Sequence, residues 1–207
     1  IRRVAPVRKP LLGYYDESKV ECVDWQIKWA VENGISVYLV DWYWNQGAES
    51  LRHWFDAYRQ ARYRDMLQVA IMWANHLPPN SHSRADWRTV TKEWIDEYFN
   101  LPAYYRLNGK PAIYLWSPEN LRNDLGGSDE VRAALAESQE MARAAGYDGI
   151  EFVAMSNHDS PSRAEILLNE GYAGATNYHE WGKAASMTKN PMRLRYADVA
   201  ATAAATW

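Results

Sequence analysis

The strongest constraint on the fold is a regular alternation of short apolar runs with longer amphipathic segments. Runs typical of buried strands occupy residues 11–15, 34–47, 67–76, 109–120, 149–160 and 172–182. Between them, apolar residues recur at the spacing of one helix face, as in Val23, Ile27, Ala30 and Val31. About six strand–helix units in series predict a parallel sheet with right-handed crossovers.

Residues at the segment ends support these boundaries. Ser18 and Glu21 have capping-box spacing and predict the start of the first helix, and Gly34 fits its end. Ser83 is expected to cap the helix that follows the third strand. Pro161 suits the first turn of a later helix, which is expected to end at Gly171.

The choice between an open doubly wound sheet and a (β/α)8 barrel depends on how the strands end. No G-x-G-x-x-G follows the first strand, and no Walker A motif occurs. Instead, each strand ends in polar or aromatic groups, which are Tyr15–Asp16, Asp41–Trp42, Trp73–Asn75–His76, Trp116–Ser117, Ser156–Asn157–His158 and Tyr178–His179–Glu180. Barrels carry their sites at this end of the strands. We therefore expect one barrel domain over residues 1–207, incomplete at its C-terminal side, with about six of its eight units present.

Aromatic usage is unusual, with 11 Trp and 14 Tyr against 3 Phe. Rings with a polar edge suit places where one side is apolar and the other meets hydrogen-bonding groups. Two interpretations remain open. One is a Trp-rich core and surface, and the other is a cleft lined with flat rings on which sugars can stack.

Several classes of function find no support in the sequence. The net charge is -3 and there is no basic run, so no nucleic-acid partner is expected. The His residues lack metal-binding spacing, no G-x-S-x-G occurs, and no cofactor motif is present. Cys22 is the single cysteine, and no apolar run reaches the length of about 20 residues that a membrane span needs. The chain begins at Ile1 without a signal peptide and is expected to be part of something longer.

Four stretches, in this order, resemble the WbsX-type domain related to family 99 glycoside hydrolases. They are "LLGYYDES", "QIKWAVENGISVYLVDWYW", "IMWANH" and "YYRLNGKPAIYLWSP", and the likeness extends over about residues 11–178. The resemblance implies a (β/α)8 barrel and a carbohydrate-active enzyme, foremost a retaining, mannosidase-like glycoside hydrolase acting on a polysaccharide or glycan. It also leaves open a glycosyl-transfer role in polysaccharide biosynthesis, or a glycan-binding barrel without catalysis.

The resemblance further implies that the main catalytic acids lie in a late "W-N-E-W-x-E-G" motif, beyond residue 207. Only the stretch "NYHEWG" at 177–182 is similar, and it has one of the two acids. Glu180 and Asp41 are therefore the catalytic candidates within the chain. The family's mechanism lets the sugar 2-hydroxyl take the part of the nucleophile. A polysaccharide hydrolase would favour an extracellular or periplasmic location, and the oligomeric state stays open.

The expected sugar-binding residues come from the strand ends. They are Tyr15, Asp16, Trp44, Trp73, Asn75, His76, Trp116, Asn157, His158, Tyr178 and His179. Strand alternation places Asp41 in phase with Val37 and Leu39, facing inward, whereas Trp42 is expected to pack outward under helices. Trp44 is expected beyond the strand end, curling over the rim. Asp41 has a competing interpretation as a structural acid. His53 and Trp54, on a helix, are interpreted as packing or surface residues.

Overall fold

The computed structural model describes residues 9–45, 47–76, 82–155, 161–178 and 195–204. Its strands are β1 (Val37–Asn45), β2 (Ala48–Ser50), β3 (Gln68–Trp73), β4 (Arg106–Leu107), β5 (Lys110–Leu115), β6 (Glu151–Met155) and β7 (Gly174–Thr176). Its helices are α1 (Val20–Glu32), α2 (His53–Gln60), α3 (Arg84–Glu93), α4 (Pro118–Leu125), α5 (Ser128–Ala144), α6 (Pro161–Glu170) and α8 (Tyr196–Ala204). Short 3-10 and π segments, η2 (Arg64–Met66) and η3 (Trp94–Tyr98), complete the elements.

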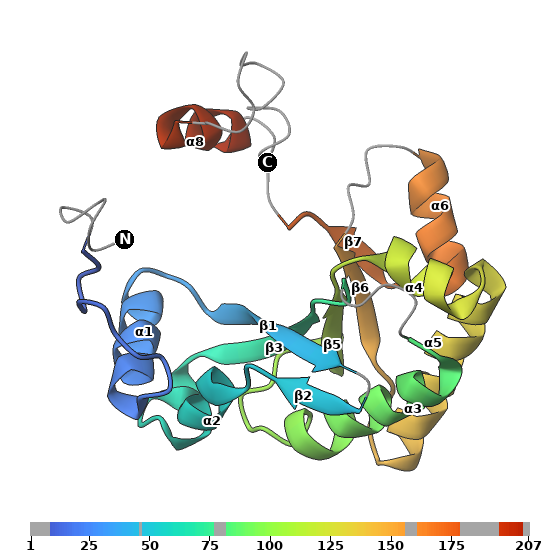
Figure 1. Ribbon diagram of the computed structural model, residues 1–207, viewed down its shortest axis with the longest axis horizontal. Helices are drawn as coiled ribbons and strands as arrows, with labels where there is room; N and C mark the ends of the chain where they lie inside the picture. The colour runs from blue at the N-terminus through green and yellow to red at the C-terminus, as the bar shows by residue number, and fades with distance from the viewer. Residues whose placement is uncertain (1–8, 46, 77–81, 156–160, 179–194, 205–207) are drawn as a thin grey trace.

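The strands form one sheet in the order β2-β1-β3-β5-β6-β7, and β4 pairs with β5 (Figure 1). β1, β3, β5, β6 and β7 run parallel, and each pairs with the next along the chain. A doubly wound sheet would reverse its direction of growth at a switch point. The consecutive order is that of a (β/α)8 barrel, of which this chain supplies an open, unclosed part.

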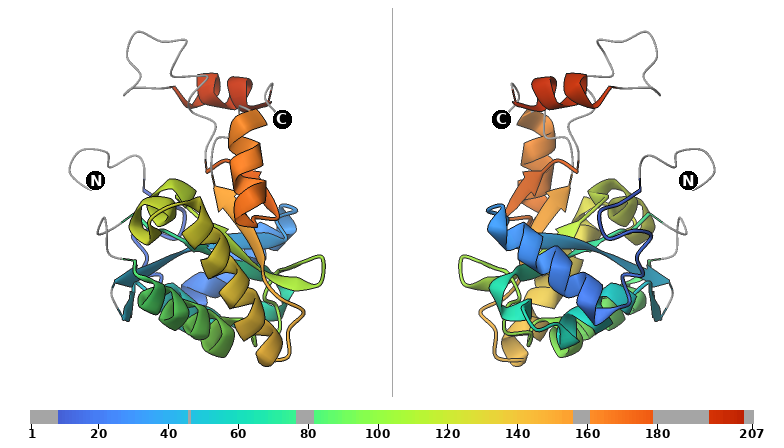
Figure 2. Two further views of the ribbon diagram at one scale, coloured as in Figure 1. Left: turned by 90° about the vertical axis from the view of Figure 1, so that its right-hand side faces the viewer. Right: turned by 90° about the vertical axis from the view of Figure 1, so that its left-hand side faces the viewer.

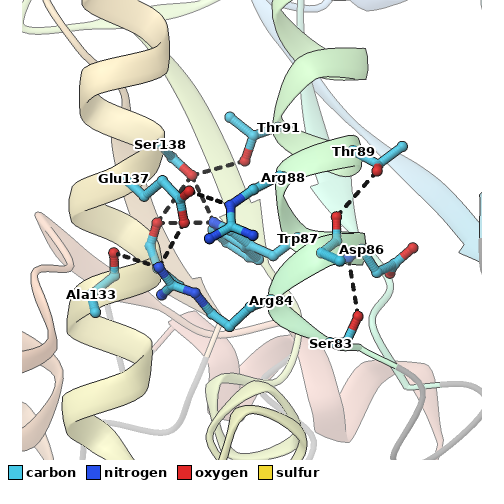
Figure 3. Close-up of polar contacts among 12 residues, drawn as sticks. Ser83, Arg84, Asp86, Trp87, Arg88, Thr89, Thr91, Ala133, Glu137 and Ser138 are labelled. Atoms are coloured by element: carbon cyan, nitrogen blue, oxygen red, sulfur yellow. Dashed lines mark hydrogen bonds and ion pairs between the residues drawn. The ribbon is translucent and has the colours of Figure 1, made fainter.

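Helices cover one face of the sheet (Figures 1 and 2). α3 docks on α5 through Trp87, whose indole Nε1 donates to Ser138 Oγ at 2.7 Å. Arg84 on α3 pairs with Glu137 on α5 at 2.6 Å at the edge of this contact (Figure 3). Ser83 caps α3 as expected, because its Oγ accepts from Asp86 N at 3.1 Å.

The core between sheet and helices is dominated by indole rings. Trp42 stacks on Trp44, with ring centroids 5.4 Å apart and planes 15° apart. Trp73 and Trp94 pack edge-on against Trp42, and Trp87 packs in turn against Trp73 and Trp94. All of these side chains are buried, so the abundance of Trp is to a large extent a property of the core.

Two local expectations are wrong. Residues 11–15 are described and form no strand. Ser18 does not cap α1: the helix begins at Val20, with Lys19 at its N-cap position. Ser18 instead donates from both its backbone N and its Oγ to Asp16 Oδ1, at 2.9 and 2.6 Å. The local hydrogen bonds of an Asx turn replace the capping box here. Within the described residues, no helix is long and apolar enough to cross a bilayer.

Candidate functional site at the carboxyl ends of the strands

The face of the sheet away from the helices carries the candidate site. In register, the inward-facing row at one level contains Asp41, Met72, Tyr114, Val153 and Gly174. Toward the carboxyl ends, Tyr43 follows Asp41 in phase on β1, and Trp116 follows Tyr114 in phase beyond the end of β5. Val37 and Leu39 share the face of Asp41, and Leu39 is 40% exposed whereas Trp42 is 1% exposed. The predicted phase of β1 is therefore confirmed.

Asp41 is the carboxylate of the row at its own level. Partial burial raises its pKa, and this effect outweighs two opposing ones. The hydroxyl of Tyr43 donates to Asp41 Oδ2 at 3.3 Å, and nearby His76 adds a favourable charge interaction; both lower the pKa. Burial and the carboxylate of Asp41 in turn raise the pKa of Tyr43. Asp41 and Tyr43 thus form a hydrogen-bonded pair on this face of the sheet.

His76 lies between two rings at the strand ends. Its imidazole centroid is 5.0 Å from the ring of Trp116 and 6.2 Å from that of Tyr43. The Nδ1 atom of His76 is buried and has no hydrogen-bond partner in the part of the chain that the structure describes. Trp116 and Tyr43 remain partly exposed. The structure thus brings together Asp41, His76 and Trp116, as the sequence indicated.

A groove of about 410 Å³ runs alongside Asp41. Its lining comprises Glu17, Tyr38, Leu39, Val40, Asp41, Tyr43, Leu51, His53 and Trp54. His53 Nε2 lies 2.9 Å from Glu17 Oε1. The sequence interpretation missed Tyr43, Glu17 and the groove position of His53. The signal for Tyr43 was available, since it shares the phase of Asp41.

Trp44 and Trp73 do not reach this site, which corrects their expected placement. β1 continues to Asn45, because residues 43–45 pair with β2. Trp44 therefore keeps the outward phase, is 6% exposed, and donates from Nε1 to Asp86 Oδ1 at 2.9 Å. Trp73 is fully buried because its neighbour Met72 takes the inward position on β3.

Asn75 lies at the site but its amide is occupied. Its Nδ2 donates to Ser117 O, and its Oδ1 accepts from Ser117 N, both at 2.8 Å. The side chain is 1% exposed. It therefore joins two strand ends, and Ser117 takes one N–H of Nδ2 and one lone pair of Oδ1 in place of a sugar.

The remaining expected residues are exposed or lie outside the described residues. Tyr15 and Tyr178 are exposed, at 44% and 54%, and Tyr178 lies close enough to Tyr43 to contribute to the raised pKa of its hydroxyl. Hydrogen bonds from Ser18 lower the pKa of Asp16, as suits its turn. Asn157, His158, His179 and Glu180 lie outside the described residues. Among the described residues, no group of three or more His, Cys, Asp or Glu side chains could hold a metal ion.

A sequence profile described as "Glycosyltransferase WbsX" matches residues 5–204, nearly the whole chain. This chain belongs to the WbsX family. None of the curated proteins matches it.

Solved structures similar to this WbsX chain are described as endo-alpha-mannosidases of family GH99 from Bacteroides thetaiotaomicron. One, in complex with BIS-TRIS-propane, has a TM-score of 0.61 at 18% identity, over 86% of this chain and 55% of the other. Another has a TM-score of 0.60 at 21% identity, over 88% and 49%. The chain therefore spans about half the length of these structures and shares their fold.

Proposed function

We propose that this chain is part of a glycoside hydrolase that acts on a mannose-containing polysaccharide or glycan. The observation that carries the proposal is the position of Asp41. A carboxylate with a raised pKa lies on the inward face at the carboxyl ends of parallel strands, beside two aromatic rings and an imidazole. This is where barrel enzymes hold their substrates.

The neighbouring groups suit a sugar. Trp116 offers a partly exposed ring for the C–H face of a pyranose, and His76 and Tyr43 offer polar atoms for its hydroxyls. Asp41 serves as hydroxyl acceptor or as one of the two carboxylates that glycoside hydrolysis requires. The description of the similar structures as endo-alpha-mannosidases supports an α-mannoside as substrate. The resemblance to family 99 implies a retaining route through the sugar 2-hydroxyl.

A second candidate is glycosyl transfer, which the description of the matching profile favours. Both activities use the same cleft and differ in the acceptor, which is water in one and a sugar hydroxyl in the other. A glycan-binding barrel without catalysis is the third possibility.

The test uses the complete protein and a panel of α-mannans and unrelated glycans. Release of reducing ends, with kcat/KM lowered roughly thirtyfold in Asp41→Asn, supports hydrolysis. Chain extension in the presence of an activated sugar donor, without release of reducing ends, supports transfer instead. Retention of a glycan without turnover indicates a binding barrel. Absence of both turnover and binding across the panel would overturn the proposal.

A further inference from the structure

We infer that Asn75 is a positioning residue that fixes His76 against Trp116 by adding one side-chain rung between β3 and β5. The geometric part of this inference stands on the contacts alone, whereas its consequence for turnover rests on the proposed function. Asn75 does not touch a sugar in this arrangement. It acts through its two neighbours.

Backbone pairing of β3 with β5 ends before Asn75, and the side chain of Asn75 then connects the two strands. Regular β3–β5 register ends at Trp73 opposite Leu115, and Trp116 N then donates to Trp73 O at 3.0 Å. One step farther, the amide of Asn75 meets both backbone groups of Ser117 at 2.8 Å. The side-chain amide therefore supplies the donor and the acceptor that a backbone peptide would supply in the next rung.

The backbone of β3 needs this anchor because it turns sharply here. Asn75 N donates to Trp73 O, and His76 N donates to Ala74 O, both at 2.9 Å and both across two residues. Successive turns of this kind leave the strand direction, so pairing of β3 no longer sets where His76 lies. The hydrogen bonds from the Asn75 amide to Ser117 fix the distance between this part of the chain and the end of β5.

A second contact closes the arrangement. Asn120 Nδ2 donates to Asn75 O at 3.2 Å, and Asn120 N donates to Ser117 Oγ at 3.1 Å. The start of α4 is thereby tied to the same point. His76 follows Asn75 directly, and Trp116 precedes Ser117 directly. The bonds between Asn75 and Ser117 therefore join the residues next to the two rings, whose centroids are 5.0 Å apart.

The change that tests the rung is Asn75→Asp, which keeps the size of the side chain but replaces the donor facing Ser117 O with a second acceptor. Two other variants are compared with it. Ser117→Ala removes the cap of α4 and leaves both backbone groups of the rung. Asn100→Asp makes the same chemical change at an exposed amide that donates to Asp96 O, at the end of η3.

The primary measurement is the proton NMR signal of the His76 ring in histidine-labelled protein, assigned with His76→Gln. A ring held beside Trp116 has a ring-current shift. We expect Asn75→Asp to move this signal toward that of a free histidine. Ser117→Ala and Asn100→Asp should leave it in place. Should Asn75→Asp not fold, Asn75→Ser carries the same expectation, because it also removes the rung.

Turnover of α-mannan by the complete protein is the second measurement. We expect Asn75→Asp to lower kcat/KM by roughly tenfold to a hundredfold, the scale of misplaced groups at a site. An unmoved His76 signal in Asn75→Asp, or an equal movement in Ser117→Ala, would overturn the inference. Absence of glycan activity in the unmodified protein would count against the proposed function, while the NMR comparison would still decide the role of Asn75.

Discussion

The indole Nε1 of Trp44 donates to Asp86 Oδ1 at 2.9 Å and so ties the end of β1 to the first turn of α3. The bond lies under the helix layer, where Trp44 is 6% exposed. A residue from the most aromatic stretch of the chain thus holds the scaffold together beneath the site.

Replacement of Trp44 by Phe should destabilise the fold without changing glycan turnover. The variant keeps a ring for Trp42 to stack on but leaves the Asp86 oxygen without this donor, at a cost of about 1–3 kcal/mol in the free energy of unfolding. Urea denaturation gives this value. Trp25→Phe, at a ring 45% exposed on α1, is the control and should stay within about 0.5 kcal/mol. Loss of turnover in folded Trp44→Phe would show that Trp44 has a role in substrate binding or catalysis.

The Asp41→Asn variant should separate activity from stability. We expect kcat/KM to fall roughly thirtyfold, or about 2 kcal/mol, the scale of a lost charge-assisted hydrogen bond. Because burial raises the pKa of Asp41, ionisation of this group disfavours the folded state. The loss in the free energy of unfolding from this ionisation is absent below the usual aspartate pKa and complete above the raised pKa of Asp41.

Relative to the unmodified protein, Asp41→Asn should therefore be more stable at pH 7 than it is at pH 3. Thermal unfolding at both pH values measures it. Unchanged kinetics with a lowered melting temperature at pH 7 would show that Asp41 is a structural acid.

Removal of the Tyr43 hydroxyl should shift the acidic limb of the pH–activity profile. Its hydrogen bond to Asp41 lowers the pKa of that carboxyl, so Tyr43→Phe should raise the pKa further. If turnover needs ionised Asp41, the acidic limb moves to higher pH. Tyr63→Phe, in the connection between α2 and β3, is the matched control. If the acidic limb of the profile does not move in Tyr43→Phe, the ionisation of a group other than Asp41 determines it.

Breaking the ion pair between Arg122 and Glu170 should lower the free energy of unfolding more than breaking an ion pair at the surface. Glu170 is fully buried and accepts from the Arg122 guanidinium at 2.6 and 3.0 Å and from Ser128 Oγ at 2.6 Å. Glu170→Gln removes the carboxylate that Arg122 pairs with, and because the Arg122 side chain is 24% exposed we expect a loss of about 1–3 kcal/mol.

Glu140→Gln provides the comparison for this variant. Glu140 pairs with Arg143 at 2.6 Å, but both side chains are more than half exposed. Such pairs contribute about 0–1 kcal/mol. Arg122 lies on α4 and Glu170 on α6. Equal losses in the two variants, measured by urea denaturation, would contradict a stabilising role of the buried pair between these helices.

Local pattern predicted the parts of the fold that depend on local geometry. Alternation along β1 fixed the inward phase of Asp41, and Ser83 marked the start of α3. The same alternation, applied to β3, would have placed Trp73 outward. Trp44 was misplaced because β1 continues to Asn45 by pairing with β2, and no apolar run marks β2 in the sequence.

Other features depend on partners that are distant in the chain. An apolar run at residues 11–15 satisfies strand composition, but a strand also needs a neighbour, and the run has none in the sheet. Asn75 looked free at a strand end, yet Ser117 occupies its amide. Sequence gives the type of polar group at a position but not which of its hydrogen bonds the backbone already uses.

The pleat of β1 also bears on how such a protein can diversify. Odd-numbered positions from Val37 to Tyr43 face the open side, while even-numbered positions from Tyr38 to Trp44 build the indole core. Substitutions on the open face can therefore alter the ligand while the indole layer persists. Adjacent positions of this one strand therefore meet different physical demands, one set at the open face of the sheet and the other in the packing of the core.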